Sequence, residues 1–255
     1  MLVKLTLRNI RATLNLRTFL IWFAMAGIAV FFFFTSTGRI ELVNENEVRF
    51  MTLFLPQIIF GAWAVLSVFF DLVSADREHN VLDCILCSGV TKKQFFYAKI
   101  ISAAVVSMLL SFIYLFPITV VIALFSDFSN IMLLIRYLIP FWGYIMVFAA
   151  IGITISILAR SSKVSLIWSL AIGLILMPRF FIIIVEALGS VFHWSQVVIN
   201  RVSMISPGAL MNALANSESF TNFIIAIIVF SAYVLILFSV SYLSFSHQDE
   251  YNYGE

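Results

Sequence analysis

The sequence predicts an all-α membrane protein with six transmembrane helices, and three observations support this fold class. Of the 255 residues, 62% are hydrophobic and only 11% are charged, far less charge than a soluble domain of this size carries. The apolar residues form long continuous runs, and about 20 such residues suffice to cross the hydrocarbon core as a helix. The runs also lack the period of two that strands of a membrane barrel show.

Six runs are long enough to span a membrane. They cover roughly 18–38, 51–73, 100–126, 132–159, 164–184 and 222–245. The first run follows basic residues, as a signal peptide does, but it is long and has no cleavage pattern after it, so we interpret it as an uncleaved span. We expect one transmembrane domain over residues 1–255, made of an interfacial helix (1–17), six spans (18–245) and a cytoplasmic tail (246–255).

The first residues predict an amphipathic helix over 2–16 with two separate stripes. The apolar stripe holds Val3, Leu7, Ile10 and Leu14, and the basic stripe holds Lys4, Arg8 and Arg11. Such a helix fits the headgroup layer of the membrane, where anionic lipid attracts the basic side. The alternative is an ordinary basic flank that only sets the topology.

The distribution of basic residues predicts that both termini are cytoplasmic. With the N-terminus inside, ten Lys and Arg residues fall on the inner side and five on the outer side, which is the bias that cytoplasmic loops show. The inner ten are Lys4, Arg8, Arg11, Arg17, Arg77, Lys92, Lys93, Lys99, Arg160 and Lys163, and the outer five are Arg39, Arg49, Arg136, Arg179 and Arg201. We expect a multi-pass protein of the plasma membrane.

The connections between the spans differ in length and polarity. An acidic loop is expected outside at 39–50, and tight hairpins are expected at 127–131 and 160–163. The segment 186–221 is too polar for a span and too apolar for a free loop. We predict one or two short helices there, half-buried in the outer leaflet and bent near Pro207.

The longest polar stretch on the inner side is 74–99, and it has local signals of its own. Asp76 is placed to cap a short helix, and Gly89 is placed to end it. The residues from Thr91 to Gln94 form a capping box that starts the next helix. The apolar side chains of the short helix fall on one side, and these are Val81, Leu82, Ile85 and Leu86.

No catalytic or metal-binding set is found in the sequence. A P-loop is absent, so any energy from ATP has to come from another chain. Cys84 and Cys87 have the C-x-x-C spacing, but only His79 is near enough to join them as a zinc ligand, so we expect buried structural cysteines. Neither a Ser/His/Asp set nor an HExxH pattern occurs, and we expect no nucleic-acid partner.

Arg179 follows Pro178 inside the fifth predicted span. It lies roughly 22 Å into a core of about 30 Å, so its side chain is able to extend to the outer interface or to pair with Glu186. The alternative is that Arg179 and Glu186 belong to a substrate pathway.

The segment 74–99 resembles the signature region of ABC-2 type transporter permeases. Asp76-Arg77-Glu78 matches its acidic start, the apolar pairs 81–82 and 85–86 match its hydrophobic part, and Lys99 matches the lysine at the start of the third span. The family's Gly-Thr is replaced by His79-Asn80, and its turn proline is absent. The order of an N-terminal elbow helix, six spans and half-buried outer helices before the last span is also similar.

The resemblance implies a permease subunit of an ATP-driven exporter and not an enzyme. Two subunits, identical or closely related, would form the substrate pathway and pair with two ABC ATPase chains that bind ATP and Mg²⁺, so this chain holds no cofactor. The coupling helix would contact the ATPase through Asp76, Arg77, Glu78, Leu82, Asp83, Ile85 and Leu86.

Two other classes remain open from the sequence. One is a channel or secondary transporter, although the spans hold almost no buried acids of the kind that ion coupling uses. The other is a membrane assembly factor without an ATPase. The sequence names no substrate.

Overall fold

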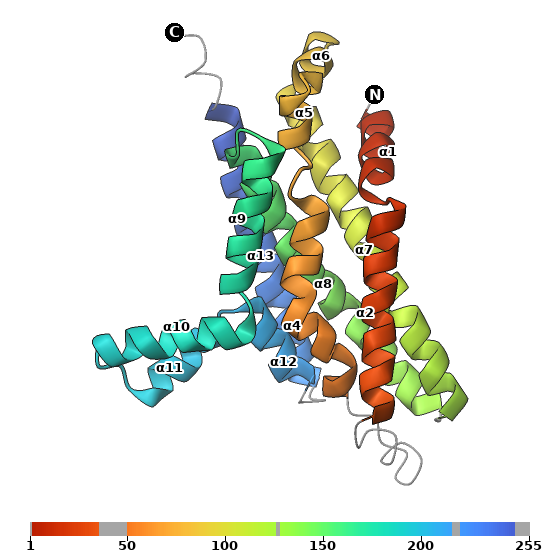
Figure 1. Cartoon of the computed structure of the whole chain (residues 1–255), viewed down its shortest axis with the longest axis vertical. Helices are drawn as coiled ribbons and strands as arrows, with labels where there is room; N and C mark the ends of the chain where they lie inside the picture. Colours follow the sequence, from red (N-terminus) through yellow and green to blue (C-terminus); the bar gives the residue numbers. More distant parts are fainter. Residues whose placement is uncertain (1, 36–49, 126–127, 216–219, 248–255) are drawn as a thin grey trace.

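The computed structural model describes residues 2–35, 50–125, 128–215 and 220–247, and within these ranges the chain forms helices and no strand. The all-α fold is therefore confirmed (Figure 1). The helices are α1 (Leu2–Thr13), α2 (Leu16–Thr35), α4 (Phe50–Phe69), α5 (Ser74–Glu78), α6 (Val81–Cys87), α7 (Lys92–Phe125), α8 (Phe128–Leu158), α9 (Ser162–Ile175), α10 (Pro178–Val191), α11 (Gln196–Ser203), α12 (Pro207–Ala215) and α13 (Phe220–His247).

Five of the six predicted spans appear as long apolar helices. Helices α2, α4, α7, α8 and α13 are each long and apolar enough to cross a membrane. They pack side by side along the long axis of the molecule (Figure 1). Helix α7 has 34 residues, which corresponds to about 51 Å and exceeds the hydrocarbon core of about 30 Å. Its ends therefore project beyond the apolar layer.

The fifth predicted span, 164–184, is wrong as a continuous helix. Helix α9 stops at Ile175, and α10 leaves it at an angle of 69°. The cause is Pro178, which has no N–H to continue the helix and pushes Met177 into an extended conformation with φ −58° and ψ 132°. At 14 residues, α9 alone is about 21 Å long, and together α9 and α10 form a broken span or a re-entrant loop.

The two ends of the bundle carry different helices (Figure 1). Helices α1, α5 and α6 lie at one end together with the last turn of α13, and we call this the α5–α6 end. Helices α10, α11 and α12 lie at the other, the α10–α11 end, where α10 and α11 project sideways from the bundle. The beginning of α1 and the end of α13 therefore lie on the same side, as the topology prediction requires.

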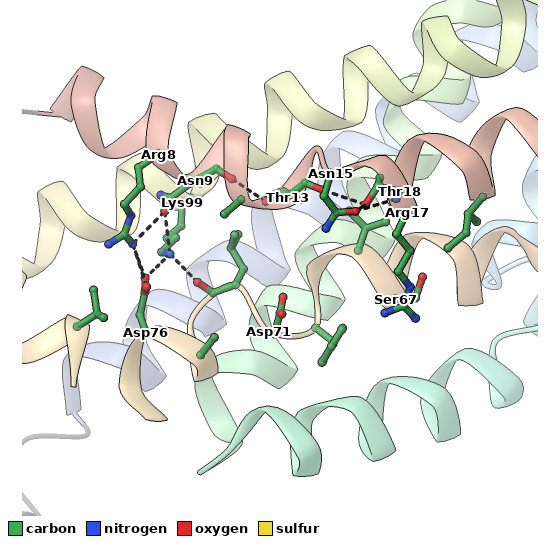
Figure 2. A pocket seen from close by; sticks show the side chains of 17 residues that line it. Arg8, Asn9, Thr13, Asn15, Arg17, Thr18, Ser67, Asp71, Asp76 and Lys99 are labelled. Atoms are coloured by element: carbon green, nitrogen blue, oxygen red, sulfur yellow. Dashed lines mark hydrogen bonds and ion pairs between the residues drawn. The ribbon is translucent and has the colours of Figure 1, made fainter. Parts of the chain in front are cut away.

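Helix α1 is present as predicted, but it does not fold across the first span as an elbow. Figures 1 and 2 show it running in nearly the same direction as α2, beyond a break at Leu14–Asn15, and beside the first turns of α7. The reason is that α1 buries a mostly polar face, which consists of Leu5, Thr6, Asn9 and Thr13. The predicted apolar stripe is exposed at Val3 and Leu7.

The outer segment contains the predicted short helices. Helices α11 and α12 fall within it, and α12 packs against α4, α8 and α13. Pro207 begins α12 instead of bending a helix, because a proline at the first helical position loses no hydrogen bond. A Cβ at Gly208 would lie 3.1 Å from Cδ of Pro178. The absence of a side chain at Gly208 therefore lets α12 approach the break in the fifth span.

Buried aromatic side chains fill the middle of the bundle around α4. Pro56 removes a backbone donor from this helix, and tyrosines of two neighbouring helices donate to carbonyls beside it. Tyr114 Oη donates to Leu53 O at 2.5 Å, and Tyr144 Oη donates to Gln57 O at 2.8 Å. These bonds join α7 and α8 to α4 inside the apolar layer.

Three predicted connections lie partly or wholly outside the described residues: the acidic loop at 39–50, the hairpin at 127–131 and most of the tail at 246–255. The tight hairpin predicted at 160–163 is present between α8 and α9. Ser161 is the N-cap of α9, and its hydroxyl accepts from Val164 N.

Replacing Gly173 with alanine is expected to separate α9 from α4. A Cβ there would lie 3.2 Å from Leu66 Cδ1, 3.1 Å from Trp63 Nε1 and closer still to Trp63 Cδ1. The indole cannot move away freely, because its Nε1 donates to Leu170 O at 3.1 Å. We expect Gly173→Ala to cost about 1–3 kcal/mol, measured as a lower apparent melting temperature in detergent. Gly27→Ala is the matched control, because nothing lies within 4 Å of its Cβ position. Equal melting temperatures for the two variants would contradict the prediction.

Candidate functional site

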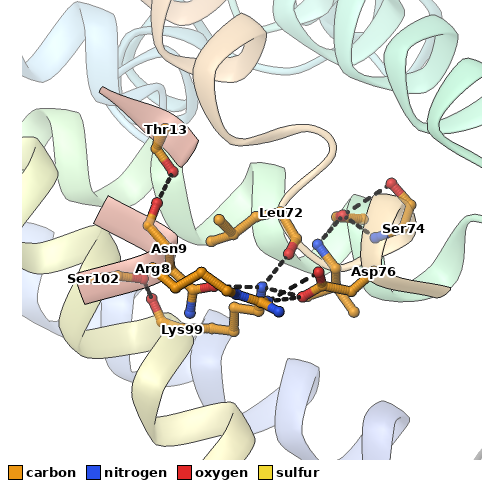
Figure 3. A network of polar contacts seen from close by, with 10 residues as sticks. Arg8, Asn9, Thr13, Leu72, Ser74, Asp76, Lys99 and Ser102 are labelled. Atoms are coloured by element: carbon orange, nitrogen blue, oxygen red, sulfur yellow. Dashed lines mark hydrogen bonds and ion pairs between the residues drawn. The ribbon is translucent and has the colours of Figure 1, made fainter. Parts of the chain in front are cut away.

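A network of charged and polar side chains joins α5 to its neighbours at the α5–α6 end (Figure 3). Its centre is Asp76, in the middle of α5. The carboxylate accepts from Arg8 Nη2 through both oxygens, at 2.9 and 2.7 Å, and from Lys99 Nζ at 2.6 Å. Helix α5 is thereby bonded to α1 and α7 at once.

Lys99 is buried, with 1% of its surface exposed. Besides Asp76, its ammonium donates to Leu72 O at 2.5 Å and to Asn9 Oδ1 at 3.1 Å, and it lies 5.0 Å from the centre of the Phe95 ring. A buried ammonium is tolerated only when its charge is neutralised and its hydrogen bonds are made, and these contacts meet both conditions.

Local sequence places Lys99 in this position. The capping box is formed as predicted: Gln94 N donates to Thr91 Oγ1 at 3.2 Å, and Thr91 N donates to Gln94 Oε1 at 3.1 Å. It starts α7 at Lys92, so that Phe95 and Lys99 lie one turn apart on the buried face.

The next residue, Arg77, binds the end of α8. Its Nη1 donates to Ile157 O at 3.1 Å and to Ala159 O at 3.0 Å. The last carbonyls of a helix have no partner within the helix and form the negative end of its dipole, so a guanidinium is well placed there.

Glu78 binds the beginning of α9. Its Oε2 accepts from Ser162 N at 2.9 Å, and the first N–H groups of a helix favour a carboxylate for the same electrostatic reason. The three consecutive residues Asp76, Arg77 and Glu78 therefore connect α5 to four different helices. Ser156 of α8 adds a further link, since its hydroxyl accepts from both Val73 N and Ser74 N at 2.9 Å.

The predicted single helix over 76–88 is wrong, because the chain breaks at Asn80. Asn80 has φ 55°, a left-handed conformation that asparagine tolerates better than most residues. Asp76 lies inside α5 and does not cap a helix. The predicted end at Gly89 is confirmed, since it has φ +85° directly after α6.

The side chains of α6 divide into two faces. Leu82 and Ile85 are partly buried and pack against the hydrophobic core, whereas Asp83 is exposed. Cys84 and Cys87 are exposed and free, which contradicts the prediction of buried cysteines. Leu86 is half-buried. The described residues contain no group of three or more side chains able to hold a metal ion.

Arg179 and Glu186 do not lie within a continuous span. Both are exposed residues of α10, after the break at Pro178. Seven residues along a helix correspond to about 10 Å, and no ion pair joins the two among the described residues. Their part in a substrate pathway stays a prediction.

Sequence reasoning missed Arg8 and Asn9 as members of the network. Arg8 was grouped with a basic stripe, and Asn9 was given no function. The missed signal is the polar series Thr6, Asn9 and Thr13, which recurs at helical spacing between the two stripes. Such a series predicts a helix face that contacts protein and not lipid.

The family comparison decides the class of protein. The model of the ABC-2 family transporter protein matches residues 57–250. The chain belongs to the ABC-2 transporter family. As an ABC-2 transporter it is the multi-pass transmembrane component of an ABC transporter, with a role in transport and not in catalysis, and permeases of this family pair with ABC ATPases. A comparison with curated proteins finds no match.

The matched region of this ABC-2 transporter contains α5 and α7 but not α1. The Arg8–Asp76 ion pair therefore connects a helix outside the matched region to the coupling segment within it.

In this ABC-2 transporter, Asp76→Asn is expected to destabilise the protein strongly, because it leaves the Lys99 charge buried without its carboxylate. Breaking a buried ion pair from one side costs about 3–5 kcal/mol. In a Lys99→Met background the same Asp76→Asn change is expected to cost much less, since the buried charge is already gone. Apparent melting temperatures of the two single variants and the double variant measure this coupling. Asp83→Asn on the exposed face of α6 is the control, and additive effects in the cycle would show that the pair is not coupled.

Proposed function

We propose that the chain is the permease subunit of an ATP-driven exporter, working as a dimer and coupled to separate ATPase chains through residues 74–99. The observation that carries this proposal is the set of contacts made by α5. Asp76, Arg77 and Glu78 link this short helix to α1, α7, α8 and α9. A movement of this segment is therefore transmitted to the long helices through ion pairs and hydrogen bonds.

The geometry supports different roles for α5 and α6. Helix α5 is bonded to α1, α7, α8 and α9, whereas α6 extends beyond it at the tip of the molecule (Figure 1). The left-handed residue Asn80 separates the two. In the proposed mechanism α6 receives the movement of the ATPase, and α5 passes it to the helix ends that it contacts. ATP and Mg²⁺ are bound by the partner chain, which supplies the energy of the cycle.

The docking face is the exposed side of α6. Leu82, Ile85 and Leu86 were expected to contact the ATPase, but Leu82 and Ile85 are partly buried against the core of this chain. The surface left for a partner contains Asp83, Cys84 and Cys87, with Leu86 at its edge. Their substitution tests docking without disturbing the core.

The rest of the proposal follows from the charge distribution and the family. The α5–α6 end is cytoplasmic, because it carries most of the lysines and arginines that set topology. Both termini then lie in the cytoplasm, and the protein resides in the plasma membrane. A second copy of the chain, or a close relative, completes the pathway, and transport runs outward.

The two native cysteines test the orientation directly. They are the only cysteines of the chain, and both are exposed on α6. With the permease expressed without its ATPase, so that α6 is uncovered, a membrane-impermeant maleimide is expected to label them in inside-out vesicles and not in intact cells. The Cys84→Ser/Cys87→Ser double variant should remain unlabelled in both preparations. Labelling of the native protein in intact cells would place α6 outside and overturn the topology.

Charge placed on the α6 tip is expected to release the ATPase. We expect Cys84→Arg/Cys87→Arg to lose at least most of the ATPase that co-purifies with the native chain after gentle solubilisation, because two bulky cations would be buried in the interface without partners. The Cys84→Ser/Cys87→Ser variant should retain it. The mass of the native complex reports the dimer in the same experiment. Full retention by the double-Arg variant, or a native mass of one permease chain alone, would contradict the assembly.

A further inference from the structure

A cavity of about 380 Å³ with both charged and apolar side chains in its wall lies between the α1–α2 junction and the start of α5 (Figure 2). This volume falls within the range of ligand pockets in proteins. The side chains that surround it come from six helices and the turn after α4. They include Asn9, Thr13, Arg17, Ser67, Asp71 and Lys99.

Three cationic and two acidic side chains line the cavity. Only some of them form ion pairs with one another. Arg8 and Lys99 are bonded to Asp76. Arg17 and Asp71 remain, and neither forms an ion pair with the other or with the network in the part of the chain that the structure describes. Figure 2 shows Arg17 reaching from α2 towards Ser67, while the carboxylate of Asp71 points into the cavity from the opposite wall. The cavity thus offers one separate cation and one separate anion.

The beginning of α2 adds positive potential beside Arg17. Asn15 caps this helix, since its Oδ1 accepts from Thr18 N at 2.9 Å, and the first backbone bond within the helix runs from Phe19 N to Asn15 O at 3.1 Å. The N–H groups of Leu16 and Arg17 precede that bond. Because Asn15, Arg17 and Thr18 all line the cavity, the positive end of the dipole of a 20-residue helix lies at its wall, which favours a phosphate.

Asn9 provides an independent sign of a missing partner. Its side chain lines the cavity and is 2% exposed. Oδ1 accepts from Lys99 and Arg8, which fixes the orientation of the amide, and Nδ2 is left buried with no hydrogen-bond partner. A buried donor without an acceptor is uncommon in folded proteins, so the polar groups beside this cavity are not fully satisfied by the chain itself.

The depth of the cavity indicates the source of the ligand. Arg17 is the last charged residue before the apolar run of α2, and Ile21 and Val68 line the side of the cavity towards that run. Charged side chains at this position lie at the level of lipid headgroups. Arg17 and Asn15 are exposed, so a headgroup is able to reach the cavity from the bilayer.

We propose that this cavity binds the headgroup of a zwitterionic phospholipid with a primary ammonium, as in phosphatidylethanolamine. The phosphate lies against Arg17 and the first turn of α2, and the ammonium donates to Asp71. The bound lipid holds the α1–α2 junction against the turn that leads into α5. This site is independent of the proposed export function, because it needs neither the ATPase nor a cargo.

Native mass spectrometry of the purified chain measures the binding of phospholipids with identical acyl chains. Phosphatidylethanolamine is expected to bind roughly tenfold more tightly than phosphatidylcholine, since a trimethylammonium has no N–H to donate and therefore loses the charge-assisted hydrogen bond to Asp71. It should also bind more tightly than phosphatidylglycerol, which has no ammonium. Equal binding of the three lipids would overturn the proposal without the use of any variant.

Two variants separate the contributions of the two charges. Arg17→Gln is expected to weaken the binding of all three lipids, whereas Asp71→Asn should remove only the preference for phosphatidylethanolamine. Arg11→Gln is the matched control, because Arg11 is an exposed cation of α1 that does not line the cavity, and it should bind like the native chain. An equal loss in Arg11→Gln would indicate general attraction to the surface and contradict a built site.

A third measurement, of the melting temperature, distinguishes a bound lipid from free phosphate. Inorganic phosphate alone is expected to raise the melting temperature much less than phosphatidylethanolamine, because it has no ammonium for Asp71. If phosphate stabilises the protein as strongly as the lipid and displaces it, the ligand is a free anion and the lipid proposal is wrong.

Discussion

The ion pair between Asp76 and the buried Lys99 is the interaction on which the α5–α6 end depends. An ammonium removed from water needs an opposite charge and a full set of acceptors, and these come from α5, from the turn before it and from α1. Arg8 adds a second cation on the more exposed side of the same carboxylate. Lys99 is therefore satisfied only when α1, α5 and α7 are all in place, which makes their arrangement specific.

The two residues after Asp76 use helix ends in the same way. Arg77 contacts the negative end of α8 and Glu78 the positive end of α9, so each charge meets backbone groups that no helical bond satisfies. At the opposite end of the molecule, steric effects of proline and glycine determine the path of the backbone. Pro178 breaks the fifth span, and the glycine at 208 lets α12 pack against that proline. Charge thus organises one end of the bundle, and steric fit organises the other.

The sequence by itself determined the features that depend on neighbouring residues. The helical membrane fold was predictable because about 20 consecutive apolar residues must satisfy their own backbone in lipid. The capping box at Thr91–Gln94 and the helix end at Gly89 were predictable because their partners lie within three residues. The resemblance to ABC-2 permeases singled out Asp76, Arg77 and Glu78 as residues that couple to an ATPase, and this role stays a prediction.

Only the tertiary structure decided what those residues contact. A carboxylate at the start of a polar segment caps a helix or pairs with a distant cation, and the partners of Asp76 lie 68 and 23 residues away. The inward orientation of Leu82 and Ile85 was undecidable in the same way, because a short amphipathic helix presents the same stripe to its own core or to a partner. The sequence shows a proline at 178 but does not give the angle at which the chain bends there. A kinked helix and two separate helices have the same local sequence, and the structure shows a bend of 69°. Local energies fix the elements, and long-range packing and charge choose among the contacts that those elements permit.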